Sequence, residues 1–229
     1  MRARGLVIAI DGPSGAGKST AGRAVAERLG YVFLDTGAMY RALALAALRD
    51  GVPLDDPEAV AALARRIALR LEPGGAVLLD GGDVTSSLRT QEVGAAASRV
   101  SVHPPVRRHM VALQREMGRD GGVVMDGRDI GTAVFPDADV KFYVDAHPRQ
   151  RAARRHEELA QRGLSSDLDT IEREIRERDH ADSTRADSPL TRARDAIHLD
   201  TTDLGLEDVV RRMLAAVDTV RPDAAGRGS

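Results

Sequence analysis

The stretch GPSGAGKST, Gly12 to Thr20, follows the apolar run LVIAID and decides the fold. It matches the pattern G-x-x-x-x-G-K-[ST] at Gly12, Gly17, Lys18 and Ser19, with a strand-like run before it and a helix-like run after it. Glycines let consecutive backbone N–H groups turn toward phosphate oxygens, and the start of the next helix adds positive charge. The stretch predicts a phosphate-binding loop; the alternative, a plain glycine-rich turn, is disfavoured by this context.

Lys18 is one of only two lysines in a chain that otherwise uses arginine; the other is Lys141. A lysine carries a compact charge on a flexible stem, so it can follow a phosphoryl group that shifts, whereas the planar arginine fork is harder to accommodate. We therefore expect Lys18 to be catalytic. The nucleotide-binding loop is expected to comprise Gly12, Pro13, Ser14, Gly15, Ala16, Gly17, Lys18, Ser19 and Thr20.

A metal site is predicted beside this loop. Ser19 is placed to reach Mg²⁺, directly or through water, and Asp126 at the end of VVMD is a candidate acidic partner. Carboxylates at strand ends also serve as turn or helix caps, and that reading stays open for Asp126.

The bulk composition limits the classes of function. The chain has 229 residues, a formal charge of −2 and no cysteine, and its isoelectric point is about 6.3. These values indicate a soluble globular protein without the basic excess of a nucleic-acid binder, and they exclude disulfides and thiolate metal sites. The apolar part of the N-terminal segment is too short for a signal peptide or membrane span, so we expect a cytoplasmic protein.

Strand-like and helix-like runs alternate along the chain, which predicts an α/β fold with a roughly five-stranded parallel sheet flanked by helices. The expected strands are 6–10, 31–34, 123–125, 140–144 and 197–199. Between Asp55 and Val102 a capped helix and a hairpin around Gly74 and Gly75 suggest an insertion off this sheet. The region 148–194, dense in arginine and glutamate, predicts exposed helices that need a ligand to order fully.

We expect four parts on this basis. The P-loop core comprises 1–35, 103–147 and 189–220, the region binding a nucleoside monophosphate comprises 36–102, the lid and substrate-closing helices comprise 148–188, and a flexible tail comprises 221–229.

The rest of the chain must identify the phosphate acceptor, because a P-loop alone does not. The sequence contains no asparagine, so the Asn-Lys-x-Asp base reader of a GTPase is absent, and the chain is small for a motor ATPase. Arginines beside acids or glycines recur instead, namely Arg41, Arg128, Arg178 and Arg185. Fixed cations of this kind suit transfer between two anionic substrates. For Arg173 and Arg176, which alternate with glutamates, a solvated helix face is the better reading.

These motifs together resemble the bacterial cytidylate kinases of the nucleoside monophosphate kinase group. The resemblance covers nearly the whole chain, through IDGPSGAGKST, LDTGAMYRALALAAL, SLRTQEVGAAASRVSVHPPVR, VMDGRDIGTAVFPDADVKFYVDA and ERDHADSTRADSPL. It implies ATP-dependent phosphorylation of CMP and dCMP, a parallel-sheet core, an enlarged monophosphate-binding region and a short lid. Ser19 departs from relatives that carry glycine there.

The resemblance also implies roles for single residues. Thr36, Arg41, Arg128 and Arg185 would bind the acceptor and its phosphate, and Ser98, Arg107 and Asp129 would read the cytosine edge. Asp182 and Arg178 would lie near the sugar and phosphates, while Arg151, Arg154 and Arg155 would cover ATP. Arg128, Arg178 and Arg185 join Lys18 as the expected catalytic groups.

The chemistry of cytosine agrees with this assignment. Cytosine offers the N4 amino donor beside the N3 and O2 acceptors, so a carboxylate such as Asp129 and a guanidinium such as Arg107 complement it. Uracil reverses the pattern at positions 3 and 4, at a cost on the order of 1–3 kcal/mol per unsatisfied group. Ser98 in a helix packing face and Arg107 on a helix surface remain the alternatives.

The expected mechanism is direct in-line transfer from Mg·ATP without a phosphorylated protein intermediate. The rival readings are a kinase acting on UMP or shikimate, and a regulatory module that binds a nucleotide without transferring phosphate. We expect small-molecule nucleotide partners and a monomer. The ratio of CMP to dCMP use, other donors, the oligomeric state, the closing rate and the role of the tail stay open at this level.

Overall fold

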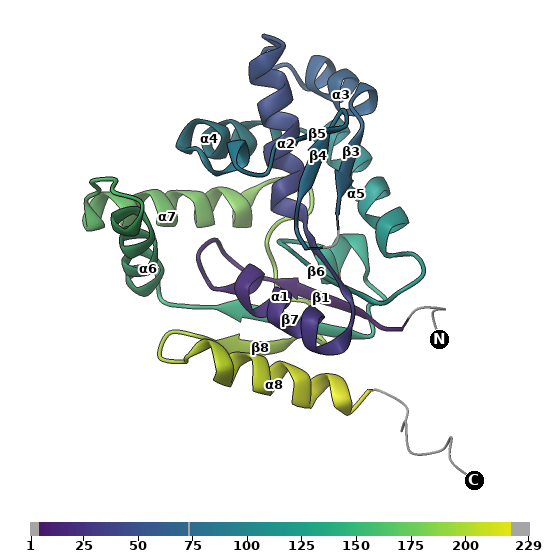
Figure 1. Ribbon diagram of the computed structural model, residues 1–229, viewed down its shortest axis with the longest axis vertical. Coiled ribbons are helices and arrows are strands. Elements are labelled where there is room, and N and C mark those ends of the chain that lie inside the picture. Colours follow the sequence, from purple (N-terminus) through teal and green to yellow (C-terminus); the bar gives the residue numbers. More distant parts are fainter. Residues whose placement is uncertain (1–4, 73, 221–229) are drawn as a thin grey trace.

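A parallel sheet of five strands, in the order β2-β6-β1-β7-β8, runs through the lower half of the molecule in Figure 1. The computed structural model describes residues 5–72 and 74–220. The strands are β1 (Val7–Asp11), β2 (Val32–Asp35), β6 (Val123–Gly127), β7 (Val140–Asp145) and β8 (Ile197–Asp200). The predicted strand set and the parallel α/β class are therefore confirmed, whereas the expected tail lies outside the described residues.

Both faces of the central strand β1 are apolar because helices or turns cover both. Ile8 and Ile10 pack into one cluster with side chains of α1 (Lys18–Leu29) and α8 (Leu206–Asp218), while Val7 and Ala9 belong to a second cluster on the opposite face. β1 pairs with β6 on one side and with β7 on the other. The carboxyl ends of these three strands therefore meet at one edge of the sheet, where ligands of open α/β folds bind.

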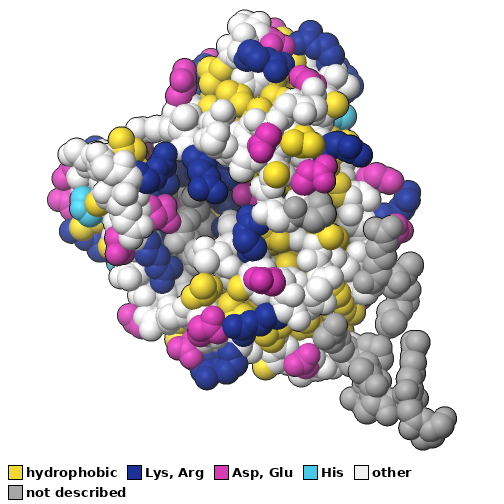
Figure 2. Space-filling view, viewed as in Figure 1, with side chains coloured by type: hydrophobic (Ala, Val, Ile, Leu, Met, Phe, Trp, Pro, Cys, Tyr) yellow, Lys and Arg dark blue, Asp and Glu magenta, His cyan; other side chains and the backbone are white. Residues whose placement is uncertain are grey.

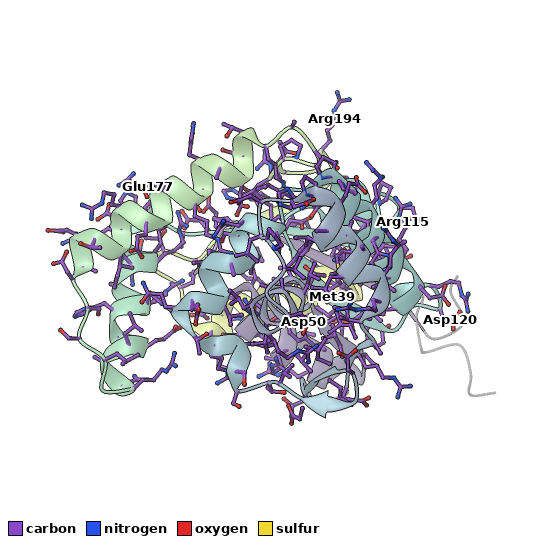
Figure 3. All side chains as sticks on the ribbon, turned by 90° about the horizontal axis from the view of Figure 1, so that it is seen from above. Met39, Asp50, Arg115, Asp120, Glu177 and Arg194 are labelled. Atoms are coloured by element: carbon purple, nitrogen blue, oxygen red, sulfur yellow. The ribbon has the colours of Figure 1, made fainter. Side chains whose placement is uncertain are left out.

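Four helices and a small sheet form a second packed region above the main sheet in Figure 1. The helices are α2 (Thr36–Arg49), α3 (Pro57–Arg66), α4 (Gln91–Val100) and α5 (Pro104–Gly118). They share a buried cluster that includes Met39 and Met110, and Figure 3 shows Met39 inside this body. Asp56 caps α3 with Pro57 in its first turn, as the sequence predicts.

The predicted hairpin is present in this region. β3 (Leu69–Leu71) pairs with β4 (Val77–Leu79) in antiparallel fashion, and the turn between them contains Gly74 and Gly75, each with φ of 91°. A third strand, β5 (Gly82–Asp83), which the sequence did not predict, pairs with β4. A short helical turn η1 (Ser87–Arg89) then leads to α4.

Helices α6 (Pro148–Gln161) and α7 (Leu168–Thr184) form an arm that projects from the sheet, at the left of Figures 1 and 3. Their buried side chains are few: Arg151 and Ala152 in α6, and Ile171 in α7. Glu177 of α7 lies on the outer side of the arm in Figure 3. The composition predicted exposed helices here, and the low apolar burial confirms that expectation.

No helix within residues 5–72 and 74–220 combines the length and the apolar character that a membrane crossing requires.

Candidate active site

The phosphate-binding loop lies between the end of β1 and the start of α1. A Cβ on Gly12 would lie 1.9 Å from the carbonyl oxygen of Val144, and Gly12 and Gly17 both have positive φ values of 145° and 86°. Only glycine fits such positions without strain. The hydroxyl of Thr201, which directly follows β8, donates to the carbonyl of Ala16 at 3.0 Å. This bond ties the phosphate-binding loop to the end of β8.

The ammonium group of Lys18 points back into the loop and donates to the carbonyl of Pro13 at 2.7 Å. Burial, and next the positive charge of Arg128, lower the pKa of Lys18 below its usual value, while Asp126 and Asp11 act in the opposite direction. Among the described residues, no carboxylate forms an ion pair with Lys18. Its charge is therefore held beside the loop by a neutral carbonyl only.

Ser19 and Asp126 meet as the sequence predicts, with the Ser19 hydroxyl donating to Asp126 Oδ2 at 2.5 Å. Burial, and next the charge of Asp35, raise the pKa of Asp126, so two carboxylates lie close enough to repel. No group of three or more His, Cys, Asp or Glu side chains that could hold a metal occurs in the described part of the chain. Mg²⁺ bound with phosphates needs only one or two carboxylates, so this oxygen set fits it.

Asp11 joins the phosphate-binding loop to the loop that follows β6. Its two carboxylate oxygens accept the backbone N–H groups of Ile130 and Gly131, both at 2.7 Å. Burial raises the pKa of Asp11 to about 6, although these two bonds lower it. The carboxylate thus fixes the segment that carries Arg128 and Asp129 to the strand end that carries Gly12.

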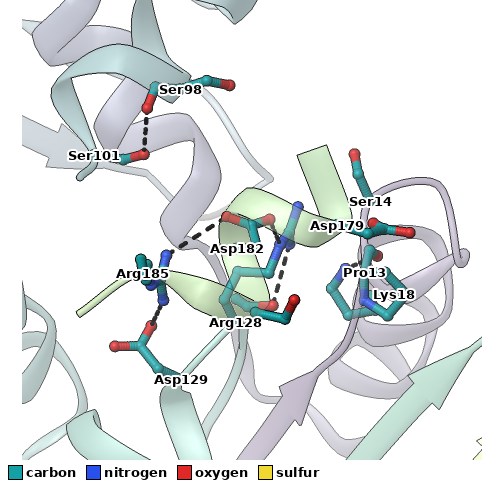
Figure 4. A network of polar contacts seen from close by, with 12 residues as sticks. Pro13, Ser14, Lys18, Ser98, Ser101, Arg128, Asp129, Asp179, Asp182 and Arg185 are labelled. Atoms are coloured by element: carbon teal, nitrogen blue, oxygen red, sulfur yellow. Dashed lines mark hydrogen bonds and ion pairs between the residues drawn. The ribbon is translucent and has the colours of Figure 1, made fainter. Parts of the chain in front are cut away.

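Arg128 and Arg185 enter a network with carboxylates of two elements. Arg128 Nε donates to Asp182 Oδ2 at 2.8 Å, and Arg185 lies 3.6 Å from both Asp129 Oδ1 and Asp182 Oδ1. Figure 4 shows Arg185 between these two carboxylates, with Lys18 and Pro13 on the other side of Asp182. The structure therefore brings together the end of α7 and the loop after β6, two segments that carry predicted acceptor residues.

Arg107 of α5 is 2% exposed and completes this network. Its Nη2 donates to Asp129 Oδ2 at 2.5 Å and its Nη1 donates to the carbonyl of Ser101 at 3.2 Å. The Arg107 Nε and the Arg185 Nη2 are buried and have no hydrogen-bond partner among the described residues. Since buried donors are normally satisfied, two unused N–H donors here point to a ligand.

Ser98 lies on α4 and donates to the carbonyl of Gly94 within its own helix at 3.2 Å, while Ser101 donates to the Ser98 carbonyl. This backbone bond is the usual one for a serine inside a helix. Ser98 is thus joined to Arg107 only indirectly, through Ser101.

The remaining predicted acceptor residues are Arg41, Thr36 and Arg178, and the charges of Arg128, Asp182 and Arg41 all act on Arg178. Arg41 donates to Asp35 Oδ2 at 2.9 Å, and the Thr36 hydroxyl donates to the backbone carbonyl of Asp126 at 2.7 Å. Arg178 keeps solvent-accessible surface but is crowded by protein atoms, and this crowding, followed by the charge of Arg128, lowers its pKa to about 10. Arg178 therefore stays charged at neutral pH.

The three arginines expected to cover ATP differ in their surroundings. Arg154 donates to the carbonyl of Thr201 at 2.5 Å and lies 3.9 Å from the Cβ position of Gly17, beside the loop. Arg155 is exposed and pairs with Glu158 on its own helix, so the structure does not bring it to the site. Arg151 is buried and bonds the carbonyl of Ser14.

Charge also marks the opening of the site. Figure 2 shows Lys and Arg side chains around a hollow between the arm and the rest of the molecule. An open pocket of about 560 Å³ separates the tip of the arm at Arg162 from the insertion at Asp83, Thr85, Ser86 and Arg89. None of the predicted site residues lines this pocket, so it marks a gap between the arm and the insertion rather than the site itself.

The family model described as cytidylate kinase matches residues 8–219. The chain belongs to the cytidylate kinase family. A cytidylate kinase from Geobacillus sp. (strain WCH70) is 50% identical over 214 residues, which cover 92% of this chain and 96% of the relative. Another, from Syntrophotalea carbinolica, is 49% identical over 217 residues, covering 93% and 92%.

A solved structure with low sequence identity has a similar fold. It is an uncharacterized protein from Eubacterium ventriosum, with a TM-score of 0.50 at 12% identity, covering 93% of this chain and 99% of that protein. Membership of the cytidylate kinase family makes the chain a kinase, an enzyme that moves a phosphoryl group from ATP to a nucleotide acceptor.

The sequence analysis did not single out three residues that contact the candidate site, namely Asp11, Asp179 and Thr201. Asp11 directly precedes the glycine-rich loop at a strand end, which is a usable signal for a carboxylate at the site. Asp179 and Thr201 have no such signal, because they meet the loop only through Arg151 and Ala16 from distant parts of the chain.

Proposed function

We propose that this enzyme transfers the γ-phosphoryl group of ATP to CMP and dCMP, giving CDP and dCDP. The observation that carries the proposal is the buried Arg107–Asp129 pair with its unused atoms. Among the described residues, the Arg107 Nε–H has no hydrogen-bond partner, and the contact given for Asp129 Oδ1 is a 3.6 Å ion pair with Arg185. One donor and one acceptor suit cytosine, which presents acceptors at N3 and O2 and a donor at N4.

Uracil is the discriminating competitor. It places a carbonyl where cytosine has its amino group, so the Asp129 carboxylate would face another acceptor. Because a buried polar group left unpaired costs on the order of 1–3 kcal/mol, the site should prefer CMP to UMP by roughly tenfold to a hundredfold.

The proposed transfer is in line and direct. An oxygen of the CMP phosphate forms a bond to the γ-phosphorus while the bond from that phosphorus to the β–γ bridging oxygen breaks, and ADP leaves with the electron pair. A phosphate monoester has a second pKa of about 6, so it is largely dianionic at neutral pH and needs no strong base. Positioning and charge neutralisation supply the rate.

The residues of this chain divide that work. Lys18 would neutralise charge on the group that moves, while Arg41, Arg128, Arg178 and Arg185 would hold the acceptor phosphate near it. Bound Mg²⁺ would offset charge on the phosphoryl oxygens, and Ser19 and Asp126 are the residues that would hold it.

Acceptor-dependent ADP formation tests the proposal. ATP is supplied with CMP, dCMP, UMP, AMP or shikimate in turn, and the two cytidine nucleotides should give the highest kcat/KM. The proposal fails if UMP or shikimate is preferred, or if no acceptor increases ADP release. A burst of phosphorylated protein with ATP alone would refute direct transfer while leaving the substrate assignment intact.

We also propose that residues 36–102 bind the monophosphate and that residues 148–188 close over both nucleotides in a cytoplasmic, monomeric enzyme. The gap at Arg162 and the low apolar burial of α6 and α7 support movement of the arm. Closure excludes water, the competing acceptor. A bisubstrate analogue should increase amide-exchange protection in 148–188, and unchanged protection would refute closure.

A further inference from the structure

Arg151, near the start of α6, bonds three separate parts of the chain. Its side chain is 3% exposed. Nε donates to the carbonyl of Ala146 at 2.8 Å, Nη1 donates to the carbonyl of Ser14 at 3.0 Å, and the fork formed by Nη1 and Nη2 holds both oxygens of Asp179 at 3.1 and 2.5 Å. A single rigid guanidinium therefore touches the phosphate-binding loop and α7 together.

On the loop side, the contact falls where a bound phosphate would act. Ser14 follows Pro13, whose carbonyl accepts the Lys18 ammonium at 2.7 Å. A phosphate oxygen that accepts a hydrogen bond from Lys18 competes with that carbonyl. Phosphate binding would therefore weaken the bond between Lys18 and Pro13 and free the peptide group that joins Pro13 to Ser14. A Cβ on Gly15 would lie 3.3 Å from Arg151 Cβ, which shows how closely the loop packs on this side chain.

On the α7 side, the contact falls among acceptor-site residues. Asp179 directly follows Arg178 and lies one helical turn before Asp182, which bonds Arg128 at 2.8 Å. Residues three apart on a helix share a face, and a helix that shifts as one unit displaces both. A shift of Asp179 would therefore carry Arg178 and Asp182 with it.

We propose that the Arg151–Asp179 pair is a positioning link through which nucleotide on the phosphate-binding loop sets the position of the acceptor-site residues on α7. The link makes the affinities for the two nucleotides depend on each other. This inference rests on the proposed function in taking CMP as the acceptor. Arg151 and Asp179 are positioning residues that act through Ser14, Arg178 and Asp182.

A second ion pair between α6 and α7 distinguishes this link from a contact that only packs the arm together. Arg149 already joins α6 to α7 at the surface through Asp169 and Glu172, and within the described part of the chain it makes no bond to the phosphate-binding loop. An ion pair that served only to hold the two helices together would behave like that surface pair. The difference supplies a matched control.

The test is calorimetric binding of CMP with and without a non-hydrolysable ATP analogue and Mg²⁺. In the wild-type enzyme the analogue should tighten CMP by about fivefold or more, the lower range of typical couplings. Asp179→Asn keeps the shape and loses the charge, so the tightening factor should fall threefold or more. By linkage, the effect of CMP on the affinity for the analogue should fall by the same factor.

Two further variants complete the experiment. Arg151→Lys keeps the charge but cannot hold Ser14 and Asp179 together, so it should lose coupling as Asp179→Asn does, and it serves if that variant folds poorly. Glu172→Gln removes one partner of the surface pair and should leave the factor within about twofold of wild type. Melting temperatures of all variants are measured alongside.

The link is refuted if the wild-type enzyme shows no coupling, if Asp179→Asn changes the factor less than threefold, or if Glu172→Gln lowers it as much. CMP phosphorylation is measured on the same preparations. If CMP is phosphorylated and coupling is unaffected, only the link fails; if CMP is not phosphorylated, the proposed function fails.

Discussion

The chain has two lysines, Lys18 at the start of α1 and Lys141 in β7, and they differ in their ionic partners. Both are buried, at 5% exposure for Lys18 and 7% for Lys141, and each donates to a proline carbonyl five residues earlier, at 2.7 and 2.6 Å. Lys141 also bonds both oxygens of Asp195, at 3.0 and 2.8 Å. Lys18 has no ion pair among the described residues, and burial, followed by the charge of nearby Arg128, lowers its pKa.

This difference separates a charge that stabilises the fold from a charge kept for a ligand. An ion-paired cation has its partner already, whereas a buried cation with a neutral carbonyl retains a desolvation cost that an incoming anion can offset. Lys18 should therefore matter to catalysis and little to stability. For Lys141 we expect the reverse.

The largest expected effect is on turnover. Lys18→Ala should lower kcat by roughly 10²-fold or more, in the range found when a preorganised charge at a transition state is removed. Because no ion pair is lost, the melting temperature should stay the same or rise. Steady-state assays and thermal melting of the same sample measure both quantities. Near wild-type turnover, or a large loss of stability, would break the comparison between the two lysines.

The comparison extends to carboxylates through Asp11, which is held by two amide N–H groups instead of a cation. Its pKa is raised from 3.8 to about 6 in the folded protein. The stabilisation linked to its proton is therefore fully present below about pH 4 and is lost as the pH rises through 6. Over this window the loss should be on the order of 2–3 kcal/mol.

Chemical denaturation from pH 4 to 7 measures this effect against Asp11→Asn, which has no carboxyl group to titrate. The free energy of unfolding of the wild-type enzyme should fall relative to that of the variant as the pH rises. Parallel curves would show that Asp11 titrates normally and that its buried charge is not costly. Asp129 and Lys18 also act on Asp11, but their effects are smaller than that of burial.

How far the sequence predicts this arrangement depends on the distance along the chain between partners. The strands, the glycine-rich loop and the order of α1 and α2 follow from local patterns. The bonds of Lys141 to Asp195 and of Asp11 to Ile130 join residues 54 and 119 positions apart. No spacing rule relates such distant positions. The sequence alone therefore does not show that Lys141 has an ionic partner and that Lys18 has none among the described residues.

The acceptor site shows the same limit. The sequence gives arginines beside carboxylates, but which guanidinium meets which carboxylate depends on how α5, α7 and the loop after β6 pack. Arg107 in α5 meets Asp129 because a buried face of its helix turns toward the sheet edge. The family resemblance identified the residue types, while only the packing shows which of their atoms remain unused.

An intermediate effect is expected for the paired lysine. Lys141→Met keeps the apolar stem against Gly131 and removes the charge from Asp195. Breaking a fully buried pair costs about 3–5 kcal/mol, but Asp195 is 64% exposed and its charge can be hydrated, so about 2 kcal/mol is expected. Denaturant unfolding measures the loss. A fall in kcat as large as that of Lys18→Ala would show that Lys141 is not structural.

The smallest expected effect concerns base choice, where a paired carboxylate is also asked to read a ligand. Asp129→Asn retains a carbonyl for Arg107 but adds an amide that can donate to uracil. The ratio of kcat/KM for CMP to that for UMP should therefore fall by roughly tenfold, which corresponds to about 1.4 kcal/mol. Because the ratio is taken within one variant, any loss of folded enzyme cancels. An unchanged ratio would show that Asp129 does not read the base. Its pairing with Arg107 would then contribute to stability alone, as the pairing of Asp195 with Lys141 does.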